Sequence, residues 1–195
     1  MRDTLTLYFV RHGETDWNKT LRYQGQSDVP LNDTGRAQAR RNGAALADHL
    51  ADPAALDYVA SPLGRTRETM RIVRAALSQS PEAFATDARL LELNYGAWQG
   101  QLSADLPRTD PEGVAWRHAD PVNWRAAGGE SYAELTARVL DWLAGVERDT
   151  IVVSHGGVSR VLRGHLLGLD PTAVPFLDVP QDKVMVIGKG RVAWV

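Results

Sequence analysis

The chain has 195 residues, of which 44% are hydrophobic and 24% charged, a balance typical of a globular protein with a core of its own. A formal net charge of −2 gives no general attraction to nucleic acid or anionic membrane, and no apolar run is long enough to span a bilayer. The absence of cysteine excludes disulfides, zinc–thiolate sites and cysteine nucleophiles. We expect a single domain over residues 1–195, in the cytoplasm by default, whose oligomeric state stays open.

Apolar runs and helical periodicities alternate along the chain. The clearest helix covers residues 131–148, where Leu135, Val139 and Trp142 recur at helical spacing and Ser131 with Glu134 forms a capping-box pattern. The predicted strands are 4–10, 58–60, 88–93, 150–154 and the pair 183–187 and 191–195, joined through 188–190; the other helices are 34–50 (capped by Asp33 or Thr34), 63–77 and 158–167. This alternation predicts a three-layer α/β fold with a mostly parallel central sheet flanked by helices.

Residues 94–130 show no clear periodicity. The segment contains three prolines and three tryptophans. A connection of this length without regular structure is either functional or disordered, and tryptophan is rare in disordered chains. We therefore expect a partly helical lid that packs over the strand ends.

Two predicted strands end in a histidine followed by glycine. Arg11-His12-Gly13-Glu14 follows the first strand, and Ser154-His155-Gly156-Gly157 follows the strand at 150–154. Ligands of open α/β sheets bind at the carboxyl ends of the strands. The two imidazoles are therefore predicted to face one small ligand.

Three further charged residues complete a candidate anion site. The guanidinium of Arg11 keeps its charge, and its planar fork matches phosphate or carboxylate. Arg65 lies at the start of the helix predicted over 63–77, where anions are favoured, and Glu92 lies at the end of the strand predicted over 88–93. Each residue alone has an ordinary surface explanation. Together they predict a site for an anion that also needs a proton delivered.

Two other functions stay open on the residues alone. A metal hydrolase could use His12 and His155 with Glu92 or Glu14 as a third ligand, although the adjacent Arg11 would repel a cation. A phospholigand-binding module without catalysis would use the same residues. Chelator sensitivity and a turnover assay separate these possibilities. His49 and His165 fall within predicted helices and are expected to be structural or exposed.

The motif Arg11-His12-Gly13-Glu14-Thr15, with Trp17-Asn18, resembles the signature of the histidine phosphatase superfamily, in its phosphoglycerate mutase-like branch. The resemblance covers nearly the whole chain. It extends to Gly25, Asp28, Pro30-Leu31 and Gly35, to Ser61-Pro62-Leu63 with Arg65, Thr66 and Thr69, to Leu91-Glu92 with Gly96, Trp98 and Gly100, to Gly129-Glu130-Ser131, and to Val153-Ser154-His155-Gly156-Gly157. It implies a phosphoglycerate mutase-like fold.

The same resemblance implies the roles of the site residues. His12 becomes a phosphohistidine, and Glu92 protonates the leaving oxygen and then deprotonates water. The residues that hold the phosphoryl oxygens are Arg11, Arg65, His155 and Asn18. Further candidates for substrate or phosphate binding are Gly25, Gly156, Gln24 and Arg117. A solvated loop explains Gln24 equally well, and a surface arginine explains Arg117 equally well. The reaction needs neither metal nor cofactor, and the partner is a small phosphorylated metabolite.

The segment 94–130 distinguishes a phosphatase from a mutase. Mutases of this family carry a lysine eleven positions after the catalytic glutamate, where this chain has Ser103, and paired arginines after a tryptophan, where it has Arg117-His118. These departures favour a phosphomonoester hydrolase of the histidine acid phosphatase type. The alternative is cofactor-dependent phosphoglycerate mutase-type phosphoryl transfer. Sugar phosphates, nucleotide-like phosphomonoesters and a ribazole-type phosphate all remain open as substrates.

Overall fold

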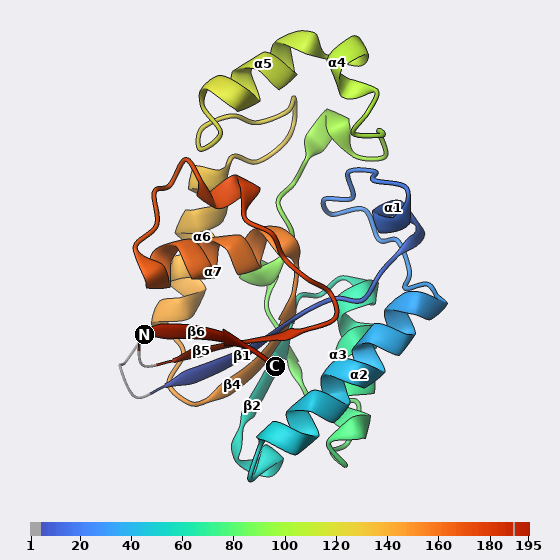
Figure 1. The fold of residues 1–195 in the computed structure, drawn as a ribbon, viewed down its shortest axis with the longest axis vertical. Helices are drawn as coiled ribbons and strands as arrows, with labels where there is room; N and C mark the ends of the chain where they lie inside the picture. The colour runs from blue at the N-terminus through green and yellow to red at the C-terminus, as the bar shows by residue number, and fades with distance from the viewer. Residues whose placement is uncertain (1–4, 189) are drawn as a thin grey trace.

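The computed structural model describes residues 5–188 and 190–195, and these form a six-stranded sheet between two layers of helices (Figure 1). The strands are β1 (Thr6–Arg11), β2 (Asp57–Ala60), β3 (Ala85–Thr86), β4 (Thr150–Ser154), β5 (Val184–Gly188) and β6 (Arg191–Trp194), in the order β3-β2-β4-β1-β5-β6. Strands β3, β2, β4 and β1 are parallel, whereas β5 and β6 are antiparallel to their neighbours. The predicted α/β fold with a mostly parallel sheet is confirmed.

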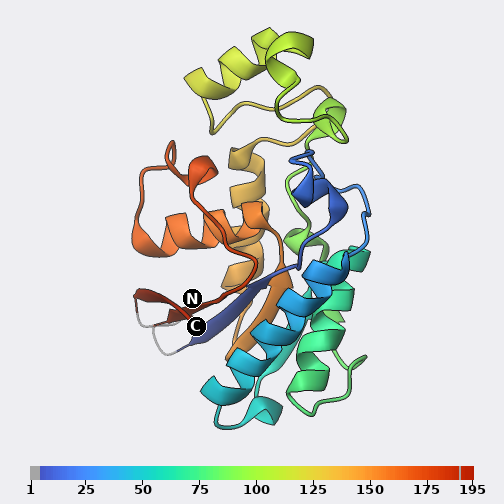
Figure 2. The same ribbon diagram turned by 45° about the vertical axis from the view of Figure 1, so that its right-hand side comes forward.

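Helices cover both faces of this sheet. The α-helices are α1 (Asp16–Lys19), α2 (Asp33–His49), α3 (Gly64–Ala76), α4 (Leu106–Thr109), α5 (Pro111–Ala119), α6 (Tyr132–Ala144) and α7 (Gly156–Leu167); the 3-10 helices are η1 (Pro53–Ala55), η2 (Ala88–Leu90), η3 (Gly96–Trp98) and η4 (Val174–Phe176). Helices α2 and α3 lie on one face and α6 and α7 on the other (Figures 1 and 2). Among the described residues, no helix combines the length and apolar character needed to cross a membrane.

Alternation along the central strands builds two separate cores. In β1, Leu7 and Phe9 pack with α6 and α7, while Val10 packs with α2 and α3 on the opposite face. In β4, Val152 joins the first core and Val153 the second. A strand that is buried on both faces reads as a continuous apolar run, which is why 5–10 and 150–153 were recognisable in the sequence.

Most predicted elements are confirmed, with shifted ends. Helix α2 is capped by Asn32, whose Oδ1 accepts from the Gly35 N–H at 2.9 Å, and not by Asp33 or Thr34. Helix α6 has the predicted capping box but ends at Ala144, while α7 begins at Gly156, earlier than predicted. The predicted boundaries at Thr4 and Lys189 lie outside the described residues.

The strand predicted over 88–93 is wrong. The described chain forms β3 at Ala85–Thr86, then η2, and reaches Glu92 in irregular backbone. Arg138 replaces a strand partner, since its Nη1 donates to the carbonyls of Arg89 and Leu91, both at 2.7 Å, and its Nη2 to that of Glu92 at 3.1 Å. Side chains therefore satisfy the backbone that a sheet ladder would otherwise satisfy.

The segment 94–130 is partly helical, as predicted. It contains η3, α4 and α5, and lies at the end of the molecule that also carries α1 (Figure 1). Its own small core consists of Trp98, Leu106, Trp124 and Ala126. The indole rings of Trp98 and Trp124 lie 4.3 Å apart between centroids, so the tryptophans hold the segment together.

The start of α2 touches the loop after β1 so closely that a side chain cannot fit. A Cβ at Gly35 would overlap the backbone of Glu14. Gly35→Ala should therefore lower the free energy of unfolding by about 1–3 kcal/mol, as overpacked sites do, although alanine favours helix. Urea unfolding measures this, with Gly145→Ala as the control because its Cβ would make only an ordinary contact at 3.5 Å. A Gly35→Ala protein as stable as the wild type would contradict the packing argument.

Candidate active site

Three parallel strands end at one edge of the sheet, and their last residues meet there. The His12 N–H donates to the Ser154 carbonyl at 2.9 Å, and the Ser61 N–H donates to the Val153 carbonyl at 3.0 Å. The rings of His12 and His155 lie 5.2 Å apart between centroids, at 63° to each other. The two predicted imidazoles are thus neighbours because β1 and β4 are paired in register.

The His12 ring is held in one tautomer. Its Nδ1 lies 2.8 Å from the Gly13 carbonyl oxygen, which can only accept, so Nδ1 carries the proton and Nε2 keeps a lone pair. Burial, and then the charges of Arg65 and Arg11, lower the pKa of His12 well below its ordinary value of 6.5. At neutral pH this side chain is therefore a neutral imidazole with a free lone pair on Nε2, as a nucleophile requires.

His155 is buried between two polar partners. Arg65 Nη2 donates to its Nδ1 at 3.3 Å, and its Nε2 donates to Ser61 Oγ at 2.8 Å. Burial lowers the pKa of His155 well below 6.5, and the charges of Arg65, His12 and Arg11 lower it further. Both ring nitrogens are thus occupied by partners from the protein itself.

Arg65 and Arg11 bring two buried positive charges to the same place. Arg65 is fully buried, its two terminal nitrogens donate to the carbonyls of Gly25 at 2.7 Å and Ser27 at 2.6 Å, and burial lowers its pKa to about 10. Arg11 Nη1 donates to the Val179 carbonyl at 2.6 Å, and burial lowers the pKa of this arginine too. Within the described residues neither guanidinium forms an ion pair, and both Nε atoms are buried without a partner. Such charges suit a site for an anion.

The Glu92 carboxylate sits at the start of α7. Oε1 accepts from the backbone N–H of Leu93 at 2.9 Å and of Gly157 at 3.0 Å, whereas Oε2 has only a longer contact with Gly157, at 3.3 Å. A Cβ at position 157 would overlap Oε1, so the second glycine of the closing motif makes room for this carboxylate. Oε2 is left with the capacity to carry a proton.

A cavity of about 130 Å³ is lined by His12, Arg11, Arg65 and Glu92, whereas the fully buried His155 is not among its lining residues. Eight of the predicted site residues line it: Arg11, His12, Asn18, Gln24, Gly25, Arg65, Glu92 and Gly156. At ~30 Å³ per water-sized group, it has room for about four such groups, which suits a phosphoryl group. Gly25 contributes through its carbonyl to Arg65, and its φ of +53° is one that glycine adopts without strain.

Four lining residues were not predicted as site residues: Arg22, Tyr23, Tyr95 and Arg160. Arg160 Nε donates to the Leu177 carbonyl at 2.6 Å and Nη1 contacts the Tyr132 hydroxyl at 3.4 Å. The pKa of Arg160 is raised, because Tyr132 and Tyr95 outweigh the opposing effect of burial. Arg160 lies one turn after Gly156 on α7, and a helix start predicted at 158 concealed that shared face.

Arg117, which was predicted as a substrate-binding residue, is not among the residues that line this cavity. Its guanidinium lies 5.5–5.9 Å from the ring centroids of Trp124, Tyr23, Phe176 and Trp98. Arg117 Nη1 donates to the Tyr23 hydroxyl at 2.6 Å. It reaches the cavity only through Tyr23, because the aromatic rings of segment 94–130 hold it by cation–π contacts.

The metal-hydrolase alternative lacks a ligand set. In the described part of the chain, no three histidine, aspartate or glutamate side chains gather as metal ligands would. The proposed third ligands are otherwise engaged, since Glu14 Oε1 accepts from Asn32 Nδ2 at 2.9 Å and Glu92 accepts from two backbone amides. Two uncompensated arginines beside the histidines also disfavour a cation.

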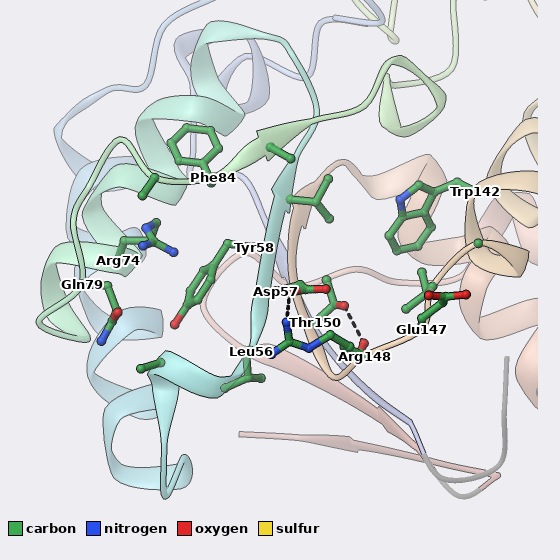
Figure 3. A pocket seen from close by; sticks show the side chains of 16 residues that line it. Leu56, Asp57, Tyr58, Arg74, Gln79, Phe84, Trp142, Glu147, Arg148 and Thr150 are labelled. Carbon is green, nitrogen blue, oxygen red and sulfur yellow. Dashed lines mark hydrogen bonds and ion pairs between the residues drawn. The ribbon is translucent and has the colours of Figure 1, made fainter.

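A larger hollow, of about 580 Å³, lies at the opposite edge of the sheet, where β2 and β4 begin (Figure 3). Several of its polar groups contact one another: Arg148 pairs with Asp57 at 3.3 Å, and Thr150 Oγ1 donates to the Arg148 carbonyl at 2.7 Å. No histidine lines it. The smaller cavity is therefore the better candidate for chemistry.

Comparison with known proteins shows the family of the chain. The model of the histidine phosphatase superfamily (branch 1) matches residues 7–194. A glucosyl-3-phosphoglycerate phosphatase of Mycolicibacterium vanbaalenii is 34% identical, over 97% of this chain and 82% of that protein. A probable phosphoglycerate mutase GpmB of Erwinia tasmaniensis is 36% identical, over 87% and 78%.

A solved structure is also similar over nearly the whole fold. The structure of a putative alpha-ribazole-5'-P phosphatase from Escherichia coli superimposes with a TM-score of 0.80 at 26% identity, covering 98% of this chain and 95% of the other. The matching family model spans both histidine motifs and the strands that bring them together. The chain belongs to the histidine phosphatase superfamily, branch 1.

Proposed function

We propose that this protein hydrolyses small phosphomonoesters through a phosphohistidine on His12. The observation that carries the proposal is the fixed tautomer of His12, whose unprotonated Nε2 remains free beside two buried arginines. A covalent intermediate replaces one difficult displacement by two easier ones. The relatives named above include phosphatases, which supports the same reaction.

The two steps balance as follows. Nε2 of His12 attacks phosphorus, the bond from phosphorus to the ester oxygen breaks, and Glu92 gives its proton to the leaving oxygen. Water then attacks the phosphohistidine, Glu92 takes a proton from that water, and the bond from phosphorus to Nε2 breaks to release inorganic phosphate. Arg11, Arg65, His155 and Asn18 hold the phosphoryl oxygens, since phosphoryl transfer depends mainly on positioning and charge stabilisation.

The alternative mutase reaction has less support from the pocket. Ser103 is exposed and its N–H donates to the Leu21 carbonyl at 3.0 Å, and His118 is exposed on α5; neither lines the cavity. A mutase must retain a bisphosphorylated intermediate while that intermediate reorients in the site. Extra cations are needed to hold its charged groups. Phosphate release from a panel of monoesters, compared with isomerisation of 3-phosphoglycerate in the presence of 2,3-bisphosphoglycerate, separates the two activities.

We also treat residues 1–195 as one catalytic domain in which 94–130 acts as a lid. Tyr95 lines the cavity and Tyr23 links the cavity to Arg117, so movement of this segment would change access to His12. The small volume beside His12 suits a phosphoryl group, while the leaving group would extend toward the lid. This arrangement supports small phosphorylated metabolites as substrates.

His12→Ala should reduce turnover by several orders of magnitude, because the covalent route is lost. Brief incubation of the wild type with labelled substrate, followed by a quench that avoids acid, should trap phosphate on His12. His165→Ala is the control, since His165 is exposed on α7. Label found on His155, or full activity without His12, would reject the assignment.

Glu92→Gln should slow alkyl phosphates by ~10²–10⁴-fold, the usual range for general acid catalysis. Activated aryl phosphates should be affected far less in the first step, because their leaving groups need little protonation. Burst kinetics with an aryl phosphate would separate phosphorylation of His12 from its hydrolysis. Equal slowing of phosphorylation for both ester classes would contradict the general-acid role.

The lowered pKa of His12 predicts activity that persists on the acid side, as in a histidine acid phosphatase. The imidazole must be unprotonated to attack, and in the folded protein it takes up a proton only well below pH 6.5. The kcat/KM, corrected for ionisation of the substrate, should therefore stay level as pH falls through 6.5 and decline only at lower pH. An acid limb centred at or above pH 6.5 would show that the charges of Arg65 and Arg11 do not act on His12 as described.

A further inference from the structure

The segment between η4 and β5 holds several cations near the site by its backbone. Three successive carbonyls each accept from an arginine: Leu177 from Arg160 Nε at 2.6 Å, Asp178 from Arg163 Nη1 at 2.5 Å, and Val179 from Arg11 Nη1 at 2.6 Å. Two of these arginines line the cavity. The segment therefore belongs to the structure of the site, although its sequence carries no catalytic motif.

Gln181 extends from this segment toward the end of β1. Its Nε2 lies 2.9 Å from the His12 carbonyl oxygen and 3.3 Å from Asn18 Oδ1. Its own carbonyl accepts from Nδ2 of the buried Asn42, at 3.0 Å, which anchors the backbone to α2. Gln181 thus links the backbone of the nucleophile with the side chain of Asn18.

The orientation of the Gln181 and Asn18 side-chain amides follows from backbone groups that can act only as donor or only as acceptor. The His12 carbonyl can only accept, so the Gln181 atom beside it is the NH₂ donor. The Thr15 N–H can only donate, and it lies 3.1 Å from the Asn18 side-chain atom that must therefore be the oxygen. Thr15 Oγ1, at 3.2 Å, and Gln181 Nε2 point at that same oxygen.

Fixing the oxygen of Asn18 also fixes its nitrogen. With Oδ1 turned toward Thr15 and Gln181, Nδ2 lies on the opposite side of the Cβ–Cγ bond, in the same amide plane, and points away from both residues. No described residue accepts a hydrogen bond from it, and Asn18 lines the cavity. An amide NH₂ can donate to a phosphoryl oxygen, whereas an amide oxygen would repel it.

We propose that Gln181 is a positioning residue of the phosphoryl site, which holds the Asn18 amide with its NH₂ toward the substrate. This inference rests on the proposed phosphatase function. Gln181 does not touch the phosphoryl group itself; it acts through Asn18.

Gln181→Glu is the sharpest test, because it keeps the shape and replaces the NH₂ donor by an acceptor. The new carboxylate would face Asn18 Oδ1, which favours the reversed amide with its oxygen toward the phosphoryl group. We expect kcat/KM to fall by ~10–100-fold, the usual effect of losing a hydrogen bond to a charged group. The affinity for inorganic phosphate, measured by calorimetry, should fall by a similar factor.

A double-mutant cycle with Asn18→Ala separates this role from a general effect of charge. Gln181→Glu also places a carboxylate beside the His12 carbonyl, so some loss of kcat/KM and phosphate affinity should remain without the Asn18 amide. That loss should be roughly threefold or more smaller than the loss in the presence of Asn18, since coupled residues are non-additive. Gln79→Glu is the control: Gln79 lines the hollow at the opposite edge of the sheet (Figure 3), so the same added charge should leave both values unchanged. An equal loss with and without Asn18, or no loss in either background, would overturn the inference.

Thermal unfolding of each variant shows whether it is folded. If Gln181→Glu does not fold, Gln181→Met removes the donor without adding charge. The cycle is then repeated, with an expected loss of ~3–10-fold that becomes smaller with Asn18→Ala. A wild type that hydrolyses no monoester would refute the proposed function alone. The phosphate affinities would then still decide whether Gln181 acts through Asn18.

Discussion

The rest of the site depends on the guanidinium groups of Arg65 and Arg11, which are buried without a carboxylate partner among the described residues. Taking such charges out of water costs several kcal/mol each, and neutral carbonyls offset only part of that cost. The carbonyls of Gly25, Ser27 and Val179 orient Arg65 and Arg11 without neutralising them. Burial and the remaining positive potential together lower the pKa of His12, and the same potential suits a bound anion.

Holding those charges requires segments that are far apart in the chain. The Val179 carbonyl reaches Arg11 from the segment before β5, and Ser27 reaches Arg65 from the loop after α1. Neither contact is local, and both need the sheet to be complete. The position of Glu92 also depends on a distant residue. Arg138 on α6 donates to the carbonyls of residues 89, 91 and 92 and so fixes the backbone of Glu92.

Segment 94–130 is stabilised by contacts different from those that stabilise the sheet. Its small aromatic core and the cation–π contacts of Arg117 are separate from the two main cores. Arg117 is thereby used as a structural contact between Tyr23 and the tryptophans, although the family resemblance suggested a substrate contact. Two other arginines, Arg160 and Arg22, line the cavity.

The sequence by itself determined the alternating α/β order, the two strand-end histidine motifs and most of the residues that line the cavity beside His12. These depend on local periodicity and on motifs contiguous in the chain. It placed Glu92 in a strand, because the irregular backbone that the distant Arg138 stabilises resembles a short apolar strand in sequence. It could not identify Arg160 or Gln181, because one depended on where α7 begins and the other on a segment without a motif. Those positions were decided by tertiary structure, in which backbone carbonyls and side-chain amides from distant segments satisfy one another and thereby orient the charges around His12.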